Sequence, residues 1–270
     1  MQAEKEQTPQ EKTSTANTTT TPNVAKPGLD FKSLQFGWFV GHALVVLNTL
    51  IFAISNLVFH PLGFFYRLAY LGVIASYGIV LWNAYKPLTN KEPYFKLMLL
   101  DENCQYLIIG VFFLFSRRIA VTLIPFFIYS VFHVLDFVDT HLIPQLAPHQ
   151  TKIQSHIQDI VNKHYDTAMM LVAKIEVCGV MTRLVLGLFV FRSSILSILV
   201  YGQFLRMRYF MSENTRKFLK ELGTKIDKAL TPPTAHPKIP PAVINAYATA
   251  KEKLTMGSKP APATTAKKQL

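Results

Sequence analysis

Two groups of side chains in this sequence could support chemistry, and the first lies in the segment FHVLDFVDTH. Its imidazoles and carboxylates recur at helical spacing, and such ligands can hold a divalent cation. They are His133, Asp136, Asp139 and His141. Membrane di-iron enzymes need histidines in paired clusters, whereas the eight histidines here are scattered along the whole chain. We therefore interpret the segment as a helix end that passes into a membrane interface, and we expect neither a metal nor another cofactor.

The second group is Glu176 with Lys174 and Arg183, inside an apolar run. Ionisable side chains within a membrane span are costly and are therefore candidates for function. Glu176 and Arg183 are seven residues apart, so they share a helix face and could pair with each other or with other helices. Two interpretations stay open. One is an ion or small-molecule transporter or channel that uses Glu176 and Arg183. The other is a segment near the interface whose basic side chains reach water.

Enzyme signatures are absent from the sequence. It has no GxSxG, no HExxH, no glycine-rich phosphate loop and no pair of carboxylates spaced for acid–base catalysis. We therefore expect no catalytic residues and predict that the chain is not an enzyme.

The composition indicates which elements must position these side chains. Half of the 270 residues are hydrophobic and only 16% are charged. This balance excludes a disordered protein and disfavours an ordinary soluble domain, in which about a quarter of the residues are charged. The segment 34–59 contains no Asp, Glu, Lys or Arg, and it exceeds the roughly 20 helical residues that cross a bilayer. We predict an all-α, polytopic helical membrane protein whose membrane domain, 34–205, has apolar segments at about 34–59, 68–85, 103–116, 119–135, 168–191 and 193–205.

Two of these segments predict short hairpin helices. Segment 103–116 would form a helix of about 21 Å, which is shorter than the hydrocarbon core of a bilayer. Together with 119–135, and around Arg117 and Arg118, it would form either a thin complete hairpin or a wedge that enters one leaflet. In the first segment, Gly37 and Gly41 have a GxxxG spacing that could allow close helix packing. The pattern is common, and we favour chance spacing.

The positive charge is concentrated after the membrane domain. From Arg206 onward there are 13 Lys or Arg and four Asp or Glu, a net of +9 out of the total of +12. We predict a cytosolic basic amphipathic region at 206–256, in which the helix 213–230 places its apolar side chains on one arc. A basic amphipathic helix after a membrane span is typical of binding to anionic phospholipid and not to nucleic acid. The predicted membrane-interface residues are Arg216, Lys217, Phe218, Lys220, Leu222, Ile226 and Lys228.

The two ends of the chain are polar and predict disordered tails, 1–33 and 257–270. The C-terminal tail ends with Lys267 and Lys268 at the fourth and third positions from the end. A lysine pair in these positions is a retrieval address for the endoplasmic reticulum (ER), and it works only on a cytosolic C-terminus. The excess of Lys and Arg in the same region favours the same orientation.

Several stretches together resemble the transmembrane protein 33 family, in order and with similar spacing over about residues 34–230. They are LDENCQYL at 100–107, Ile124-Pro125-Phe126 followed by Ser130 and His133, Glu176 in its apolar setting, and FLRMRY at 204–209. The Thr-rich N-terminal tail and the Pro-, Ala- and Lys-rich C-terminal tail look more like fungal members. The resemblance implies a multi-pass protein of the ER membrane and nuclear envelope with no known catalytic role. It also implies that reticulon-type membrane-shaping proteins and nuclear pore components are partners, with a role in organising tubular ER and the distribution or assembly of nuclear pores.

Overall fold

The described part of the protein is helical throughout. The computed structural model describes residues 30–88, 94–147, 149 and 151–230, together with 240, 242, 244, 245 and 247–249. Within these residues every regular element is a helix, which confirms the all-α prediction. Residues 1–29, most of the predicted N-terminal tail, and 257–270, the whole predicted C-terminal tail, lie outside the described residues.

The chain begins with a hairpin of two long helices, α1 (Leu34–Leu57) and α2 (Gly63–Tyr85). The hydroxyl of Ser33 caps α1 by accepting a hydrogen bond from the backbone N–H of Phe36 at 3.1 Å. The two helices cross so closely that a Cβ added to Gly72 would stand only 2.7 Å from the carbonyl oxygen of Gly41. Our interpretation of the Gly37–Gly41 spacing as chance was therefore wrong for Gly41, which faces Gly72 across the hairpin.

A short turn η1 (Lys86–Leu88) ends α2, and α4 (Glu102–Phe115) and α5 (Leu123–Phe137) follow. Among the described residues α4 packs mainly on α2 and α5 mainly on α1, so the two predicted hairpin segments do not form a packed helix pair. The small helix α3 (Tyr94–Leu99) precedes α4, and the short helix η2 (Ala120–Thr122) precedes α5. Asp101 caps α4 by accepting a hydrogen bond from the N–H of Asn103 at 2.7 Å. A π-helical turn η3 (Val138–Leu142) and α6 (Ile143–Leu146) continue the helix of α5.

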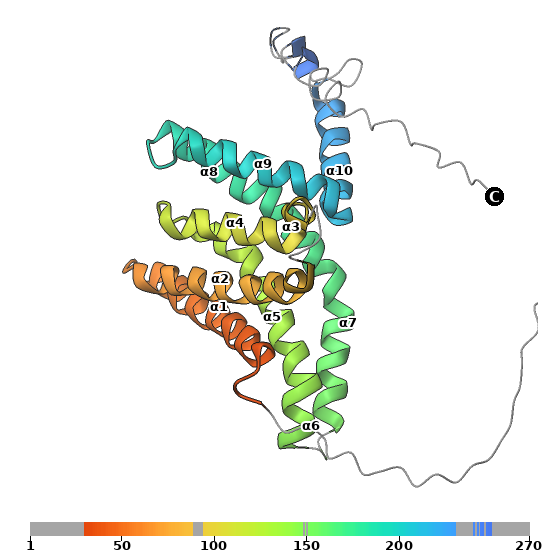
Figure 1. The fold of residues 1–270 in the computed structure, drawn as a ribbon. Coiled ribbons are helices and arrows are strands. Elements are labelled where there is room, and N and C mark those ends of the chain that lie inside the picture. Colours follow the sequence, from red (N-terminus) through yellow and green to blue (C-terminus); the bar gives the residue numbers. More distant parts are fainter. Residues whose placement is uncertain are drawn as a thin grey trace, which may run out of the picture.

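The C-terminal half of the described chain is a succession of helices that changes direction after α7, after α8 and after α9 (Figure 1). The long α7 (Thr151–Lys174) passes through a π-helical segment η4 (Ile175–Val180) into α8 (Met181–Phe189). A loop then leads to α9 (Ile195–Met211), and α10 (Glu213–Leu230) follows after Ser212. The predicted segment 168–191 thus lies across α7, η4 and α8, and segment 193–205 lies mostly in α9.

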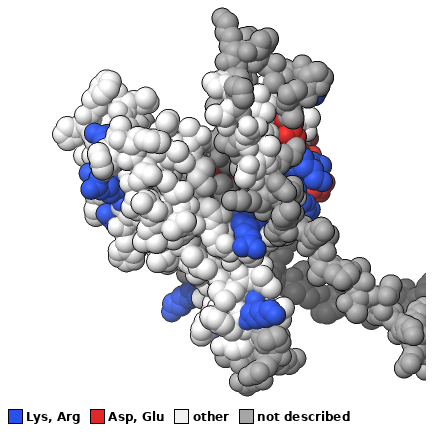
Figure 2. Space-filling view, turned by 90° about the horizontal axis from the view of Figure 1, so that it is seen from above, with Lys and Arg blue, Asp and Glu red and all other residues white. Residues whose placement is uncertain are grey.

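The three hairpin loops lie at one edge of the molecule. In Figure 1, α1–α2, α4 and α8–α9 lie roughly side by side, with the loops 58–62, 116–119 and 190–194 at the left, while α7 runs along the other side. Figure 2 shows that most of the visible face is uncharged and that basic side chains stand at the left edge, where these loops lie. Arg117 and Arg118 connect the loops. Arg117 donates to the carbonyl of Phe191 at 2.7 Å, and Arg118 covers Gly63 at the start of α2.

Two of the hairpin loops carry a phenylalanine in a left-handed backbone conformation. Phe59, after α1, has φ 56°, and Phe191, after α8, has φ 53°. Helices commonly end in this way with glycine, because a side chain in this conformation costs about 1–2 kcal/mol. Both rings are exposed, at 94% for Phe59 and 87% for Phe191. The loops therefore retain apolar side chains at their tips in spite of the backbone cost.

Among the residues that the structure describes, three helices are long and apolar enough to cross a membrane: Leu34–Leu57, Gly63–Tyr85 and Ala120–Leu146. The helix α4, at 14 residues, is shorter than these. Large apolar side chains such as Leu47 and Ile54 on α1 are exposed at 56% and 60%. Apolar side chains on the outer face of a helical bundle are unfavourable in water but are well solvated by the lipid chains of a bilayer.

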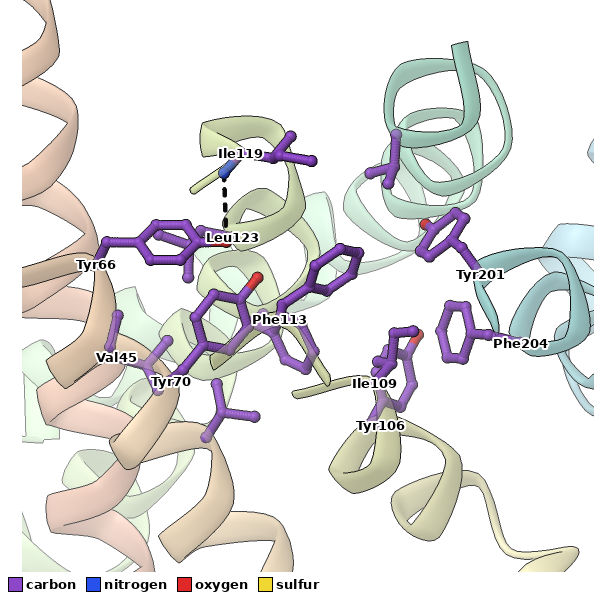
Figure 3. Close-up of a cluster of buried hydrophobic side chains, with 14 of the residues drawn as sticks. Val45, Tyr66, Tyr70, Tyr106, Ile109, Phe113, Ile119, Leu123, Tyr201 and Phe204 are labelled. Carbon is purple, nitrogen blue, oxygen red and sulfur yellow. Dashed lines mark hydrogen bonds between the residues drawn. The ribbon is translucent and has the colours of Figure 1, made fainter. Parts of the chain in front are cut away.

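The core between the hairpins is rich in aromatic rings (Figure 3). Tyr70 is fully buried, lies edge-on to Phe126, and shares a 2.7 Å hydrogen bond with the hydroxyl of Thr122. The backbone N–H of Ile119 donates to the hydroxyl of Tyr66 at 3.4 Å. These contacts join α2 to the α4–α5 loop, so α1, α2, α4 and α5 form one packed unit.

The close crossing of α1 and α2 predicts that Gly72→Ala lowers the thermal stability of the full chain in detergent. The added Cβ would meet backbone rather than a movable side chain, and overpacking of this kind costs about 1–3 kcal/mol. We expect the melting temperature to fall by roughly 5 °C. Gly78→Ala on the same helix is the control, because a Cβ there meets nothing within 4 Å. Equal melting temperatures for the two variants would contradict the close crossing.

Candidate functional site: a buried ion-pair cluster and the basic helix beside it

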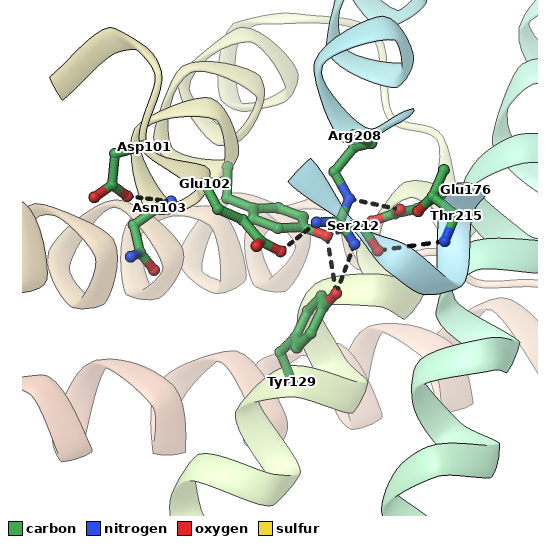
Figure 4. Close-up of polar contacts among 9 residues, drawn as sticks. Asp101, Glu102, Asn103, Tyr129, Glu176, Arg208, Ser212 and Thr215 are labelled. Atoms are coloured by element: carbon green, nitrogen blue, oxygen red, sulfur yellow. Dashed lines mark hydrogen bonds and ion pairs between the residues drawn. The ribbon is translucent and has the colours of Figure 1, made fainter. Parts of the chain in front are cut away.

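A cluster of polar side chains lies inside the helical bundle where α4, α5, η4 and α9 meet (Figure 4). We call Glu102, Tyr106, Tyr129, Glu176 and Arg208 the ion-pair cluster. Glu176 and Arg208 are only 1% and 2% exposed. Isolated charges at such burial are expensive, so they persist only when paired and hydrogen-bonded.

The guanidinium of Arg208 is the centre of the cluster. Its Nε donates to Glu176 Oε2 at 3.2 Å, and its Nη1 forms an ion pair with Glu102. Its Nη2 donates to the hydroxyl of Tyr129 at 3.1 Å. The charge also lies over the ring of Tyr106, 5.1 Å from the centroid, which adds a cation–π contact. One arginine thus contacts side chains from three other helical segments.

Hydroxyl groups satisfy the remaining oxygens of Glu176. Tyr106 donates to Glu176 Oε1 at 2.6 Å, and the hydroxyls of Tyr106 and Tyr129 lie 3.0 Å apart. The hydroxyl of Tyr201 donates to the backbone carbonyl of Glu176 at 3.2 Å. Both carboxylate oxygens of Glu176 are therefore held by protein groups, which is the arrangement of an ion pair that fixes helix positions.

The structure does not pair Glu176 with Arg183. Arg183 lies on α8, and its guanidinium lies beside Gly187 of the same helix. A Cβ added to Gly187 would stand 2.6 Å from Nη1 of Arg183 and would also meet the hydroxyl of Ser193. The sequence singled out Glu176 but not its partner Arg208, 32 residues further along the chain. Tyr201, Phe204 and Arg208 recur at helical spacing on the buried face of α9, but that spacing alone does not identify Arg208 as the partner of Glu176.

Both π-helical segments carry a buried carboxylate. Glu176 lies in η4, and Asp139, which is 8% exposed, lies in η3. Such segments are rare and shift the register of a helix, so they can turn a side chain inward that a regular helix would place elsewhere. Asp139 accepts a hydrogen bond from Gln158 of α7 at 2.8 Å, which joins the α5 and α7 helices.

The other members of the predicted metal group do not converge with Asp139. His133 faces the rings of Trp38 and His42, at 5.1 and 4.5 Å between centroids, and Asp136 is exposed. His141 stacks on Phe137 and contacts Gln35 through Nε2 at 2.9 Å. In the described part of the chain, no three His, Cys, Asp or Glu side chains gather closely enough to hold a metal ion. That the protein binds no metal stays a prediction.

The helix α10 begins beside the ion-pair cluster, five residues after Arg208. Ser212 caps it by accepting a hydrogen bond from the N–H of Thr215 at 3.3 Å, and its first part packs against α7 and α9. Lys217, Lys220 and Lys228 are exposed, and Arg216, Phe218, Leu222 and Ile226 are half-buried. Lys267 and Lys268 lie outside the described residues.

An exposed ion pair marks the first turns of α10. Lys217 donates to Glu213 at 2.8 Å. This hydrogen bond and the lysine charge lower the pKa of Glu213, and the same contact raises the pKa of Lys217. Because both groups are exposed, the pair contributes little to stability.

The ion-pair cluster predicts a large stability loss for Arg208→Met, because the buried carboxylate of Glu176 loses its counter-charge. Removing one partner of a buried pair costs about 3–5 kcal/mol. The double variant Arg208→Met with Glu176→Gln should recover part of this loss, since no buried charge remains. Thermal unfolding of the purified full chain measures both effects. Arg206→Met, at an exposed position on the same helix, is the control and should change stability by less than about 0.5 kcal/mol. If Arg208→Met were as stable as this control, the assignment of a buried ion pair between Arg208 and Glu176 would be wrong.

Comparison with known proteins shows similarity over most of the chain. The family described as transmembrane protein 33/nucleoporin POM33 matches residues 17–257. Nucleoporin POM33 of Chaetomium thermophilum is 34% identical over 233 residues, covering 75% of this chain and 81% of that protein. Tetra-spanning protein 1 of Schizosaccharomyces pombe is 31% identical over 235 residues, covering 82% of each chain. The pore membrane protein of 33 kDa of Saccharomyces cerevisiae is 31% identical over 233 residues, covering 80% of each.

No solved structure matches this chain. The names of these three relatives are those of pore membrane, membrane-spanning and nucleoporin proteins, and none is the name of an enzyme. The family match and the relatives agree with the resemblance found in the sequence, and they extend over the helices that build the ion-pair cluster. The chain therefore belongs to the transmembrane protein 33/nucleoporin POM33 family.

Proposed function

We propose that this protein is a non-enzymatic membrane protein of the ER and nuclear envelope that helps to organise tubular ER and the distribution or assembly of nuclear pores. It acts by binding curved membrane and by contacting membrane-shaping partners. The observation that carries the proposal is the helix α10, a basic helix joined to a bundle with three candidate spans.

The composition and position of α10 support binding to an anionic membrane surface. Its lysines are exposed, while Phe218, Leu222 and Ile226 share one face and are only half-buried by α7 and α9. Each basic side chain near an anionic surface contributes about 1 kcal/mol, and a buried Phe or Leu about 1.5–3 kcal/mol. A helix inserted on one side of a bilayer favours curvature toward that side.

Relatives and resemblance support the cellular setting. Two relatives are named as a nucleoporin and as a pore membrane protein. The final lysine pair supports residence in the ER with a cytosolic C-terminus. Reticulon-type proteins and nuclear pore components are the proposed protein partners, on the family resemblance.

Transport through Glu176 and Arg183 is the rival function. The geometry gives it little support, because Glu176 is occupied by Arg208 and Tyr106 and is separate from Arg183. Ion flux in proteoliposomes that disappears with Glu176→Gln would favour transport over the proposed function.

The proposal predicts that Phe218→Asp with Leu222→Asp releases α10 from the membrane in the full chain. A polarity-sensitive fluorophore on Ala229→Cys, with Cys104 and Cys178 replaced by Ser, reports its environment in proteoliposomes. We expect a blue shift with anionic lipid that the double variant loses, by at least tenfold in bound fraction. In cells that lack their own member of this protein family, the same variant should fail to restore tubular ER and pore distribution.

The matched control is Asn214→Asp with Thr224→Asp, which adds the same charge to the polar side of α10. It should retain both the blue shift and the cellular activity. If control and test variants behave alike, membrane binding by the apolar face of α10 is wrong. Equal blue shifts on small and large vesicles would contradict curvature sensing by α10 but not its binding to the membrane.

The C-terminal lysine pair predicts that Lys267→Ser with Lys268→Ser allows the protein to leave the ER. Receptor recognition of this address needs both lysines on the cytosolic side. Fluorescence microscopy should show the variant in post-ER membranes, while Lys251→Ser with Lys253→Ser remains in the ER. Unchanged localisation of the first variant would contradict the retrieval role.

A further inference from the structure

A cleft lies between the α4–α5 loop and the α8–α9 loop, at the opposite end of α9 from α10. Its volume is about 260 Å³. The polar part of the lining comes from Arg117, Arg192 and a run of serines, 193, 194 and 197, together with Ser116. Phe112, Phe191 and Leu196 form the apolar part. Basic and hydroxyl groups thus stand beside apolar walls at the edge where the hairpin loops lie.

The polar side of the cleft is rich in hydrogen-bond donors. Arg117 uses Nη1 to hold the carbonyl of Phe191, and its guanidinium carries further N–H groups. Arg192 is exposed at the rim, and its backbone is fixed by a 2.7 Å hydrogen bond to Gly187. The hydroxyl of Ser193 is buried and has no hydrogen-bond partner among the described residues. Ser116 donates to the carbonyl of Phe112, and the hydroxyls of Ser194 and Ser197 pair with each other. The two arginines are therefore the main donors, and guanidinium groups suit a phosphate, whose oxygens accept several such bonds.

A second, mainly apolar groove lies further along the bundle between α4 and α9. Its volume is about 570 Å³, and its walls include Ile108, Ile109, Leu199 and Phe204. Ile108 is one helical turn from Phe112 of the cleft, and Leu199 is within a turn of Leu196. From Leu196 in the cleft to Met207 in the groove, the two pockets follow α9 for about 16 Å, close to the thickness of one leaflet, about 15 Å.

We propose that this cleft and groove together bind one membrane phospholipid, with its phosphate on Arg117 and Arg192 and an acyl chain between α4 and α9. The match is chemical as well as geometric. The cationic end meets the headgroup, and the cleft and groove together have about the length of one leaflet. Leu199 is 64% and Leu196 is 60% exposed, so the groove opens toward the surroundings of the bundle. This site is independent of α10 and of the function proposed for it.

Native mass spectrometry of the full chain tests the proposal. The protein is released from micelles that contain dioleoyl phosphatidylserine, dioleoyl phosphatidylcholine or dioleoylglycerol at equal concentration. We expect one retained phospholipid per chain and at least tenfold less retention of dioleoylglycerol, which has the same acyl chains but no phosphate. Arg192→Gln should lower phospholipid retention at least fivefold. Leu199→Trp should lower it similarly by filling the groove while leaving both arginines in place.

Each variant has a matched control. Arg67→Gln removes a positive charge from α2 outside the cleft, and Leu186→Trp adds the same ring at an exposed site on α8. Both controls should retain phospholipid as the unaltered chain does. Equal retention of dioleoylglycerol and phospholipid would overturn the headgroup site. Unchanged retention in Arg192→Gln and Leu199→Trp would overturn the location. Displacement of phospholipid by millimolar inorganic phosphate would show a simple anion site and would overturn the role of the acyl chain.

Discussion

The arrangement of the helical bundle depends on the ion pair between Arg208 and Glu176. Both groups are almost completely buried, and neither can be charged there without the other. Glu102, Tyr106 and Tyr129 then complete the hydrogen bonds, so α4, α5, η4 and α9 must all be in register for the cluster to form. Apolar surfaces can slide past one another at small cost, whereas this cluster has one geometry that satisfies every charge. It therefore favours one packing of helices whose outer faces are largely apolar.

The cluster also fixes where the chain leaves the bundle. Arg208 is held three helical residues before α9 ends at Met211, and the cap of α10 follows at once with Ser212. The direction of α10 is thus set by a buried contact rather than by a flexible linker. A helix that binds a membrane surface at a defined depth benefits from such a rigid origin, because less conformational freedom is lost on binding.

The sequence predicted what depends on composition, and less of what depends on contacts between distant residues. The first span was evident because 34–59 lacks charge, and Glu176 was evident because an acid in an apolar run is unusual. Its partner was not, since the pairing of Glu176 with Arg208 follows from the path of α8 and α9 rather than from helical spacing. Gly41 was undervalued for the same reason. Its significance comes from Gly72, on another helix, and a GxxxG spacing alone does not reveal a partner.

The length of α9 links the two surfaces for which lipid contacts are proposed. The helix has 17 residues and is therefore about 25 Å long, with the Arg117–Arg192 cleft at its start and α10 after its end. That length approaches the hydrocarbon thickness of a bilayer, about 30 Å. If α9 lies along the membrane normal, the cleft and α10 cannot face the same membrane surface. A cytosolic α10 then places the arginines of the hairpin loops at the opposite leaflet. Their charge runs against the usual excess of Lys and Arg on the cytosolic side. A phosphate bound between Arg117 and Arg192 would neutralise charge there, so the phospholipid site would account for basic residues that the topology alone leaves unexplained.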